Sequence, residues 1–327
     1  MSSKGSPHTI CPIQKALLRT LLYFDVFHFP LTQKELHQYS SISSTIEELS
    51  MPLEELVRQG LIFQYNNSFL LQEKPDLVQQ KEENYLRALE LIHKGFRLSK
   101  RLARFPFVRG ISLSGSISKY SADKNADIDY FIITAPNRLW IARTFMHAFK
   151  KFTFLFGKQH DYCMNYYIDT AHLDIQDKNI YTAIEVATII PTVDKDIYHQ
   201  FIDANQWIQE YLPNFKIGDT QQTLQNKSWI RRFSEWFLDN RFGDWLNRYF
   251  MNWIDKKWRK HWIDQKKYPE EEYNSAMQTD THVSKNHPAN YQQKVLEKFE
   301  ARIATFEQEH SIDLSKSSYK SQKDRGL

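Results

Sequence analysis

Two aspartates separated by a single residue, Asp127 and Asp129, follow a glycine–serine pair, Gly115–Ser116, along the chain. The apolar run from Ile128 to Thr134 is typical of a strand. Because side chains alternate between the two faces of a strand, Asp127 and Asp129 should share one face, with Ile128 on the other. Two carboxylates on one rigid face can hold hard divalent cations such as Mg²⁺, which often takes its other ligands from substrate phosphates. The spacing therefore predicts chemistry on a phosphate.

The glycine and the serine suit the same chemistry. Gly115 permits a sharp turn or a close approach of the backbone to a phosphate. Ser116 offers a hydroxyl, and a helix that starts beside it would present free N–H groups to an anion. The alternative is a plain turn before a strand with polar edge residues. We favour a site, since two aspartates that enter an apolar strand are costly unless they are solvated, paired or metal-bound.

The segment Ser114–Gly115–Ser116, followed after ten residues by Asp127–Ile128–Asp129, resembles the signature of the DNA polymerase β-like nucleotidyltransferase superfamily. Ser114 stands where that family more often has an apolar residue. The resemblance implies that Gly115 and Ser116 contact a nucleoside triphosphate (NTP) and that Asp127 and Asp129 bind Mg²⁺, with two ions expected. It also implies an enzyme that transfers a nucleoside monophosphate to a hydroxyl acceptor. The sequence does not choose among a small molecule, a protein side chain and an RNA end.

Active members of that superfamily usually carry a third carboxylate on a later strand, which here corresponds to residues 161–168. The central polar residue of this segment is Asn165, which can ligate a metal through its carbonyl but cannot accept a proton as a carboxylate does. Asp161 lies about 13 Å from that position in an extended chain. Asp169 or Glu185 would serve only if the fold brings them in. The alternative is therefore a catalytically impaired, nucleotidyltransferase-like binding or regulatory protein.

The fold class expected around these residues is α/β (α+β). Residues 106–213 form a nucleotidyltransferase core with a mixed β-sheet, whose strands lie near 108–113, 128–134 and 162–168. Helices are expected at 136–156, 181–190 and 197–212. For Ser118, Lys119 and Lys124, between the two halves of the motif, a solvated loop is favoured over phosphate contact. The same preference applies to Arg138 and Arg143 on the helix that follows.

The N-terminal part is expected to form a winged-helix-like domain over residues 10–75, after a disordered tail at 1–9. Three helical stretches, the second opened by a Thr32–Glu35 capping box, precede two short strands. A connector helix then covers 76–105. The third helical stretch, near 44–59, holds four glutamates and one arginine. Because DNA affinity depends on cations, a winged-helix DNA-binding regulator is the less favoured alternative.

A helical extension is expected over 227–312, after a polar linker at 214–226 and before a disordered tail at 313–327. The segment Trp229–Trp262 holds six of the eight tryptophans, and eight Lys/Arg against four Asp/Glu. Peripheral membrane contact is one interpretation. We favour a second, in which the aromatic side chains pack on the core. A third places the basic surface beside the active site, where it holds an anionic acceptor such as RNA. Residues 264–290 are expected to be a polar loop.

The composition excludes several other classes. The chain has 327 residues, a formal net charge of +4 and two cysteines, Cys11 and Cys163, which lie far apart. Neither a disulfide framework nor a zinc knuckle is expected, and the twelve histidines show no metal-ligand spacing. The start of the sequence lacks the apolar stretch of a signal peptide, and no apolar run is long enough to span a membrane. A cytoplasmic protein is expected.

Overall fold

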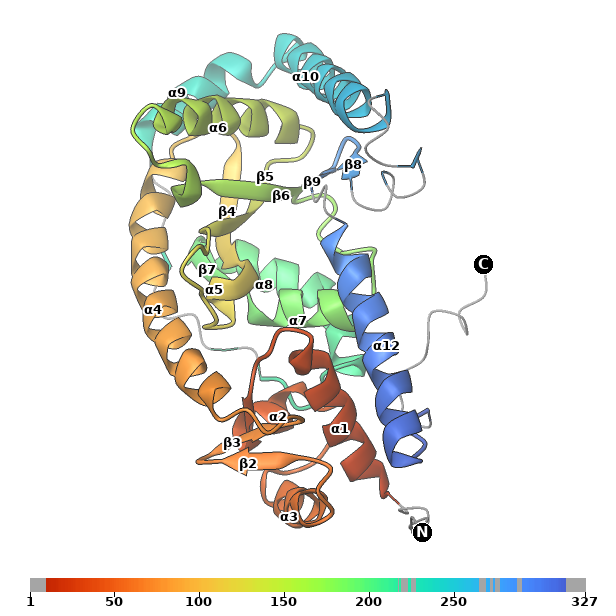
Figure 1. The fold of residues 1–327 in the computed structure, drawn as a ribbon. Helices are drawn as coiled ribbons and strands as arrows, with labels where there is room; N and C mark the ends of the chain where they lie inside the picture. Colours follow the sequence, from red (N-terminus) through yellow and green to blue (C-terminus); the bar gives the residue numbers. More distant parts are fainter. Residues whose placement is uncertain are drawn as a thin grey trace.

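The computed structural model describes residues 10–216, 218, 223–224, 228–264, 269–270, 273, 277–286 and 290–315. This part of the chain is α/β, with a mixed sheet of six strands and a separate sheet of three (Figure 1). The predicted tail at 1–9 lies outside the described residues, as do most of the tail at 313–327 and parts of the segments 214–226 and 264–290.

The N-terminal region contains short helices and a small antiparallel sheet of strand order β1-β3-β2. Its elements are α1 (Pro12–Asp25), β1 (Leu31–Thr32), α2 (Gln33–Tyr39), η1 (Glu47–Leu49), α3 (Ser50–Arg58), β2 (Phe63–Tyr65) and β3 (Ser68–Leu70). The capping box at Thr32 is confirmed, since the Glu35 amide donates to Thr32 Oγ1 at 3.3 Å and the Thr32 amide donates to Glu35 Oε2 at 2.7 Å. This box fixes where α2 begins.

Helix α4 (Asp76–Leu102) runs along one side of the molecule from the small sheet to the large one (Figure 1). Gly95 lies inside it, at a position where glycine usually weakens a helix. A Cβ there would come within 2.8 Å of the Leu113 side chain, so the glycine lets the helix lie close to the sheet.

The large sheet has the strand order β7-β4-β5-β6-β9-β8. The three expected strands are present as β4 (Val108–Ser114), β5 (Asp129–Thr134) and β6 (Cys163–Asp169). Strands β5 and β6 are parallel, whereas β4 is antiparallel to β5. The sheet is extended by β7 (Ile190–Val193), β8 (Met277–Thr279) and β9 (Val283–Asn286).

Strands β8 and β9 show that the prediction of a loop over 264–290 was wrong in part. They are short, and β9 carries Ser284 and Lys285 as buried residues. Their sequence therefore lacks the apolar alternation that indicates a strand. Strand β7 was missed for a similar reason. It is an edge strand of four residues that contains Pro191, and proline is tolerated in a strand at such an edge.

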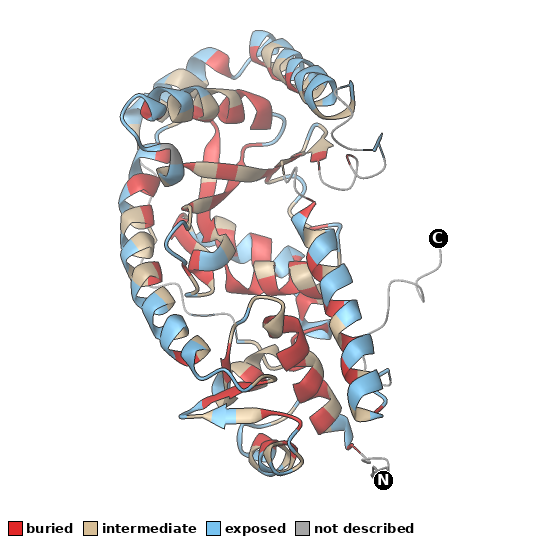
Figure 2. Cartoon of the chain, viewed as in Figure 1, coloured by how far each residue is buried: buried red, intermediate tan, exposed pale blue. Residues whose placement is uncertain are grey.

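The helices cover both faces of the large sheet, as Figures 1 and 2 show. One buried cluster joins α4, α6 (Leu139–Phe154) and α10 (Arg241–Arg259) to Tyr130 and Ile132 of β5. The other joins Phe131 and Ile133 to α7 (Ile180–Thr188), α8 (Lys195–Ala204) and α12 (Tyr291–His310), and also to α1 and α3. The alternation along β5 thus separates two cores.

The second core continues from the large sheet into the N-terminal region without a break. The Tyr23 ring of α1 lies edge-on to the Phe299 ring of α12, with the two centroids 5.4 Å apart. The centroid of its neighbour Phe24 lies 5.3 Å away. The last described helix of the chain therefore packs on the first. The domain bounds at residues 75, 105 and 213 stay predictions.

Candidate functional site

The glycine–serine turn lies against the second aspartate of the motif. Strand β4 ends at Ser114, which is the Cα partner of Asp129 in β5. Gly115 follows with a φ of +71° and begins the short helix α5 (Gly115–Ser118). A Cβ on Gly115 would lie 2.5 Å from Asp129 Oδ2. Both the backbone conformation and the space at this position therefore require glycine.

Asp127 lies just before β5, in a segment held to the start of β6. The Ile128 amide donates to the His160 carbonyl at 3.0 Å, and the Cys163 amide donates to the Ile128 carbonyl at 3.1 Å. Ile128 is buried, whereas Asp127 and Asp129 are half-buried. Ile128 belongs to the core on one face of the sheet and Asp129 lines a cavity on the other, whereas Asp127 lies before the strand begins. Asp127 Oδ1 is paired with His160 Nδ1.

The surroundings of Asp129 disfavour its charged form. Burial raises the pKa of this carboxyl group to about 6, and the negative charges of Asp127 and Glu185 act in the same direction. A hydrogen bond from Cys163 and the charge of Lys119 oppose the shift. A cation at this place would favour the ionised form. Two neighbouring carboxylates can bind a divalent cation; of these two, Asp129 lines the cavity described below, whereas Asp127 is not among the residues that line it.

A β-bulge in β6 places Asn165 beside these groups. Asp129 pairs with Cys163 and Phe131 with Tyr166, so β6 has one more residue than β5 between the two pairs. Asn165 and Tyr166 both line the same cavity, although they are consecutive. Bulges commonly redirect side chains in this way near functional sites. Asn165 Nδ2 donates to Cys163 Sγ at 3.1 Å.

Of the acids considered as substitutes for Asn165, the fold brings in Glu185. This residue lies on α7, lines the cavity and pairs with Lys119 Nζ at 2.8 Å. Asp169 is the Cα partner of Thr134 at the other end of β5 and β6, about 17 Å from Asp129. Asp161 forms an ion pair with Lys94 of α4.

A cavity of about 480 Å³ opens in front of Gly115, Ser116 and Asp129. Side chains from α1, α2, β5, β6, α7, β9 and the start of α12 line it. Its polar end includes Lys119 and Lys285, and Lys285 Nζ also contacts Asp177 Oδ2 at 2.6 Å. Its aromatic end includes Tyr23 and Phe24 of α1.

The expectation that Lys119 is a solvated loop residue was wrong, because this side chain is largely enclosed and faces the cavity. Ser118 is buried and donates to the Gly115 carbonyl at 2.9 Å, whereas Lys124 is exposed. Sequence reasoning missed Lys285, because nothing in its local pattern indicates a strand. Arg143 lies in the other core, with its guanidinium 4.7 Å from the centroid of the Trp258 ring.

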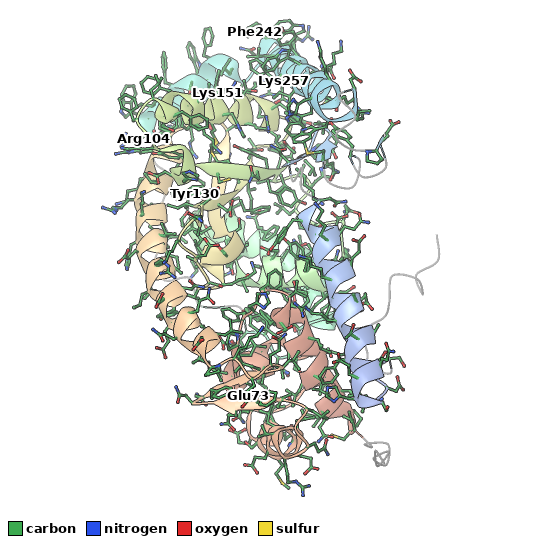
Figure 3. The ribbon with its side chains drawn as sticks, viewed as in Figure 1. Glu73, Arg104, Tyr130, Lys151, Phe242 and Lys257 are labelled. Carbon is green, nitrogen blue, oxygen red and sulfur yellow. The ribbon has the colours of Figure 1, made fainter. Side chains whose placement is uncertain are left out.

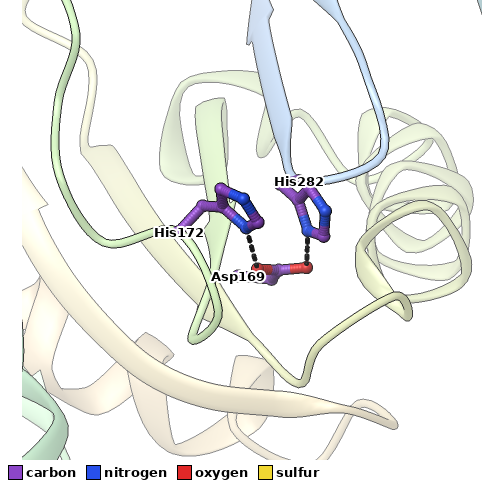
Figure 4. Close-up of side chains that lie close together, drawn as sticks. All are labelled: Asp169, His172 and His282. Atoms are coloured by element: carbon purple, nitrogen blue, oxygen red, sulfur yellow. Dashed lines mark hydrogen bonds and ion pairs between the residues drawn. The ribbon is translucent and has the colours of Figure 1, made fainter.

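Asp169, His172 and His282 form a second polar group, at the far end of β6 (Figure 4). Their ligand atoms lie within 4.8 Å of one another, so the three residues could hold a metal ion. However, the two imidazole rings are stacked, with centroids 3.6 Å apart and planes 24° from parallel. A ring nitrogen binds a metal about 2 Å away in the plane of the ring. A single ion therefore cannot lie in the planes of both imidazole rings, about 2 Å from a nitrogen of each, unless one ring rotates.

In this arrangement Asp169 acts as a structural anchor. It is fully buried, and its Oδ2 accepts from the Asn137 amide at 3.0 Å and pairs with His282 Nδ1 at 2.8 Å. Its Oδ1 accepts from the Ala171 amide at 3.0 Å. The carboxylate thus ties the end of β6 to the turn before α6 and to the β8–β9 hairpin.

Comparison with known proteins adds no relative. No protein-family model matches the chain, and searches of curated proteins and of solved structures also return no match. Within the described residues, no helix is both long enough and apolar enough to cross a membrane.

Proposed function

We propose that this chain transfers a nucleoside monophosphate from an NTP to a hydroxyl acceptor. The observation that carries the proposal is the direct apposition of the Gly115 turn and the Asp129 carboxylate, at the polar end of a cavity large enough for a nucleotide. The antiparallel pair β4–β5, followed by a parallel β6, also supports the nucleotidyltransferase fold that the motif implies.

Each residue of the site has a role in this proposal. Asp127 and Asp129 hold Mg²⁺, with two ions expected, and the bound metal neutralises charge that develops on the phosphates. Gly115 lets the triphosphate approach the backbone, and the exposed hydroxyl of Ser116 faces the cavity and binds it. Lys119 adds positive charge on the same side.

In this proposal the N-terminal region forms part of the wall of the acceptor site and does not bind DNA. Its element order and the sheet order β1-β3-β2 fit the winged-helix resemblance. Helix α3 would be the reading helix, and its Arg58 is already paired with Glu55. Phosphate contact needs free cations, so specific DNA binding stays disfavoured. The two free cysteines, Cys11 and Cys163, fit a reducing, cytoplasmic compartment.

Thermal unfolding with Mg²⁺ and each of the four common NTPs tests binding first. A ligand that prefers the folded form raises the unfolding midpoint by mass action, and we expect this for at least one NTP. Transfer is then measured with α-labelled NTP in wild type and Asp129→Asn. Asp123→Asn is the matched control, because this exposed aspartate lies in the same segment and its Oδ1 bond to the Asn125 amide survives the change.

The presence of Asn165 instead of an acid favours one second candidate, nucleotide binding without transfer. A midpoint shift that is lost in Asp129→Asn, without label transfer to any acceptor or to water, would establish that candidate. If no NTP shifts the midpoint with either Mg²⁺ or Mn²⁺, both candidates are wrong.

A further inference from the structure

Helix α9 (Trp229–Leu238) turns its apolar face away from the protein. Trp229 and Trp236 are 75% and 77% exposed, and Phe233 between them is exposed as well. A surface helix normally directs its apolar stripe at the core. The expectation that the aromatic side chains of this segment pack on the core was therefore wrong for α9, whereas Phe250 and Trp258 of α10 do pack against a buried cluster.

Polar contacts hold α9 in this orientation. Glu235 Oε1 accepts from the Phe107 amide and from Arg109 Nη1, both at 2.7 Å. Arg231 Nη1 donates to the Val108 carbonyl at 2.9 Å. These bonds lie at the start of β4, on the inner side of the helix. The outward position of the tryptophans is thus fixed by several bonds to the body of the protein.

Helix α10 and the end of α6 extend this surface. Along α10 the exposed aromatic residues follow a helical spacing of three and four residues, so they form one stripe. Contacts Trp140–Trp258 and Phe145–Phe250 show that α6 and α10 are antiparallel, which brings the last turn of α6 to the start of this stripe. We call the following exposed residues the aromatic surface: Phe152, Leu155, Phe156, Trp229, Phe233, Trp236, Phe237, Phe242, Trp245, Tyr249 and Trp253.

Basic side chains predominate around the aromatic surface. Each acid of this segment has a partner: Glu235 as above, Asp239 and Asp244 with the buried Arg138, and Asp255 with Thr279 and Arg259, although the Asp239 and Asp244 side chains stay 68% and 48% exposed. The exposed basic side chains at the outer rim outnumber these two acids: Arg232, Arg248, Lys256, Lys257 and Lys260. The rim is therefore complementary to an anionic surface.

The position of this surface argues against an RNA acceptor site. The α10 side of the sheet belongs to one buried cluster, while the cavity is lined by residues of the other, on the opposite face of the sheet. The rings of Phe242, Trp245 and Tyr249 also stack on one another, with interplanar angles of 27° and 19°. Nucleobases bind by stacking on aromatic ring faces, whereas Trp and Tyr side chains are enriched at the membrane–water interface.

We propose that the aromatic surface binds an anionic lipid membrane, with α9 and α10 lying in the headgroup region and the basic rim on the phosphates. This is the composition of an interfacial helix, with aromatic and aliphatic residues on one side and Lys/Arg beside them. Figure 3 places Phe242 and Lys257 at the end of the molecule opposite Glu73, so a membrane there leaves the N-terminal region free. The inference does not depend on the proposed function.

Vesicle co-sedimentation of the full chain tests it. We expect binding to phosphatidylcholine vesicles that contain phosphatidylserine, much weaker binding to phosphatidylcholine alone, and loss of binding as salt increases. Trp229→Ala with Trp236→Ala should weaken binding by about tenfold. Lys256→Gln with Lys257→Gln should weaken binding to anionic vesicles by about twenty-five-fold, since each cation near such a surface contributes about fivefold.

Two control variants lie away from the aromatic surface. Leu86→Ala removes an exposed apolar side chain from α4, and Lys74→Gln removes an exposed charge next to Glu73, at the other end of the molecule. Both should bind vesicles like wild type. All variants change exposed residues, so thermal unfolding should show them folded.

Four results would overturn the proposal. The first is no binding to anionic vesicles. The second is binding that both pairs of substitutions leave unchanged. The third is absence of vesicle binding together with self-association in sedimentation velocity that the tryptophan substitutions abolish. That result would assign the surface to a second copy of the chain. RNA binding without vesicle binding would likewise assign the basic rim to nucleic acid.

Discussion

Gly115→Ala is the substitution that most directly tests the geometry of the site. Gly115 has a φ of +71°, and a Cβ there would meet Asp129 Oδ2 at 2.5 Å, Cγ at 3.2 Å and Cβ at 3.3 Å. Gly60 has almost the same φ, +70°, but a Cβ on Gly60 would have no other atom within 4 Å. Gly60→Ala is therefore a matched control that carries the backbone strain without the contact.

The expected cost to stability is modest for both variants and larger for Gly115→Ala. A left-handed conformation costs a non-glycine residue about 1 kcal/mol. The atom nearest to the new methyl group is the end of the Asp129 side chain, which can rotate away at about 1 kcal/mol more. We expect urea titration to give about 1 kcal/mol of destabilisation for Gly60→Ala and about 2 kcal/mol for Gly115→Ala.

The effect on the nucleotide should differ sharply, because rotation of Asp129 removes a carboxylate from the turn. The midpoint rise caused by Mg²⁺ and NTP should be lost in Gly115→Ala and kept in Gly60→Ala. Equal responses in the two variants would show that the turn and Asp129 do not act together, and the reasoning would fail.

Three further predictions concern single side chains. Asp129→Asn should stabilise the ligand-free protein at pH 7.5 but not at pH 3.5. The folded-state pKa of Asp129 is about 6, above the ordinary value of 3.8, so between these pH values the native state holds more protons than the unfolded chain. The wild-type protein therefore loses stability as the pH rises from 3.8 through 6. Urea titrations at both pH values measure this, and a pH-independent effect of the substitution would contradict the burial of Asp129. Asn165→Asp should add a carboxylate beside Cys163 and Asp129 and tighten the Mg²⁺-dependent NTP response, measured as a lower half-saturating Mg²⁺ concentration; no change would place residue 165 outside the metal site. Asp169→Ala should destabilise the fold by about 3 kcal/mol in urea, since it removes a fully buried carboxylate that accepts from the Asn137 and Ala171 amides and pairs with His282. A loss below about 1 kcal/mol would show that the carboxylate is not an anchor.

The chemical motif could be predicted from sequence because it depends on local rules. A strand period of two predicts that Asp127 and Asp129 share a side, and a glycine at the start of α5 indicates a turn with special backbone angles. Strand β5 follows from a nearly continuous apolar run, since its residues from Tyr130 to Thr134 are buried. Such features need no knowledge of distant contacts.

The rest of the site depends on tertiary packing that no local pattern encodes. Lys285 reaches the cavity because β9 pairs with β6, and that pairing is formed between segments far apart in the chain. Glu185 reaches it because α7 packs under β5, in a core shared with the N-terminal helices. For α9 the local pattern was present but gave the wrong orientation. Its periodicity is that of a helix packed by its apolar side, whereas its polar side makes the contacts with the rest of the protein.

The return of α12 to α1 has a consequence for the order in which the protein is completed. The cavity is walled by Tyr23 from the beginning of the chain and by Tyr291 from near its end, with Lys285 just before. During synthesis, the first helices and the motif strands leave the ribosome well before β9 and α12 do. A nascent chain, or one shortened before β9, therefore holds the Asp127–Asp129 pair without this part of the cavity wall, and the cavity is complete only after the start of α12 has been synthesised.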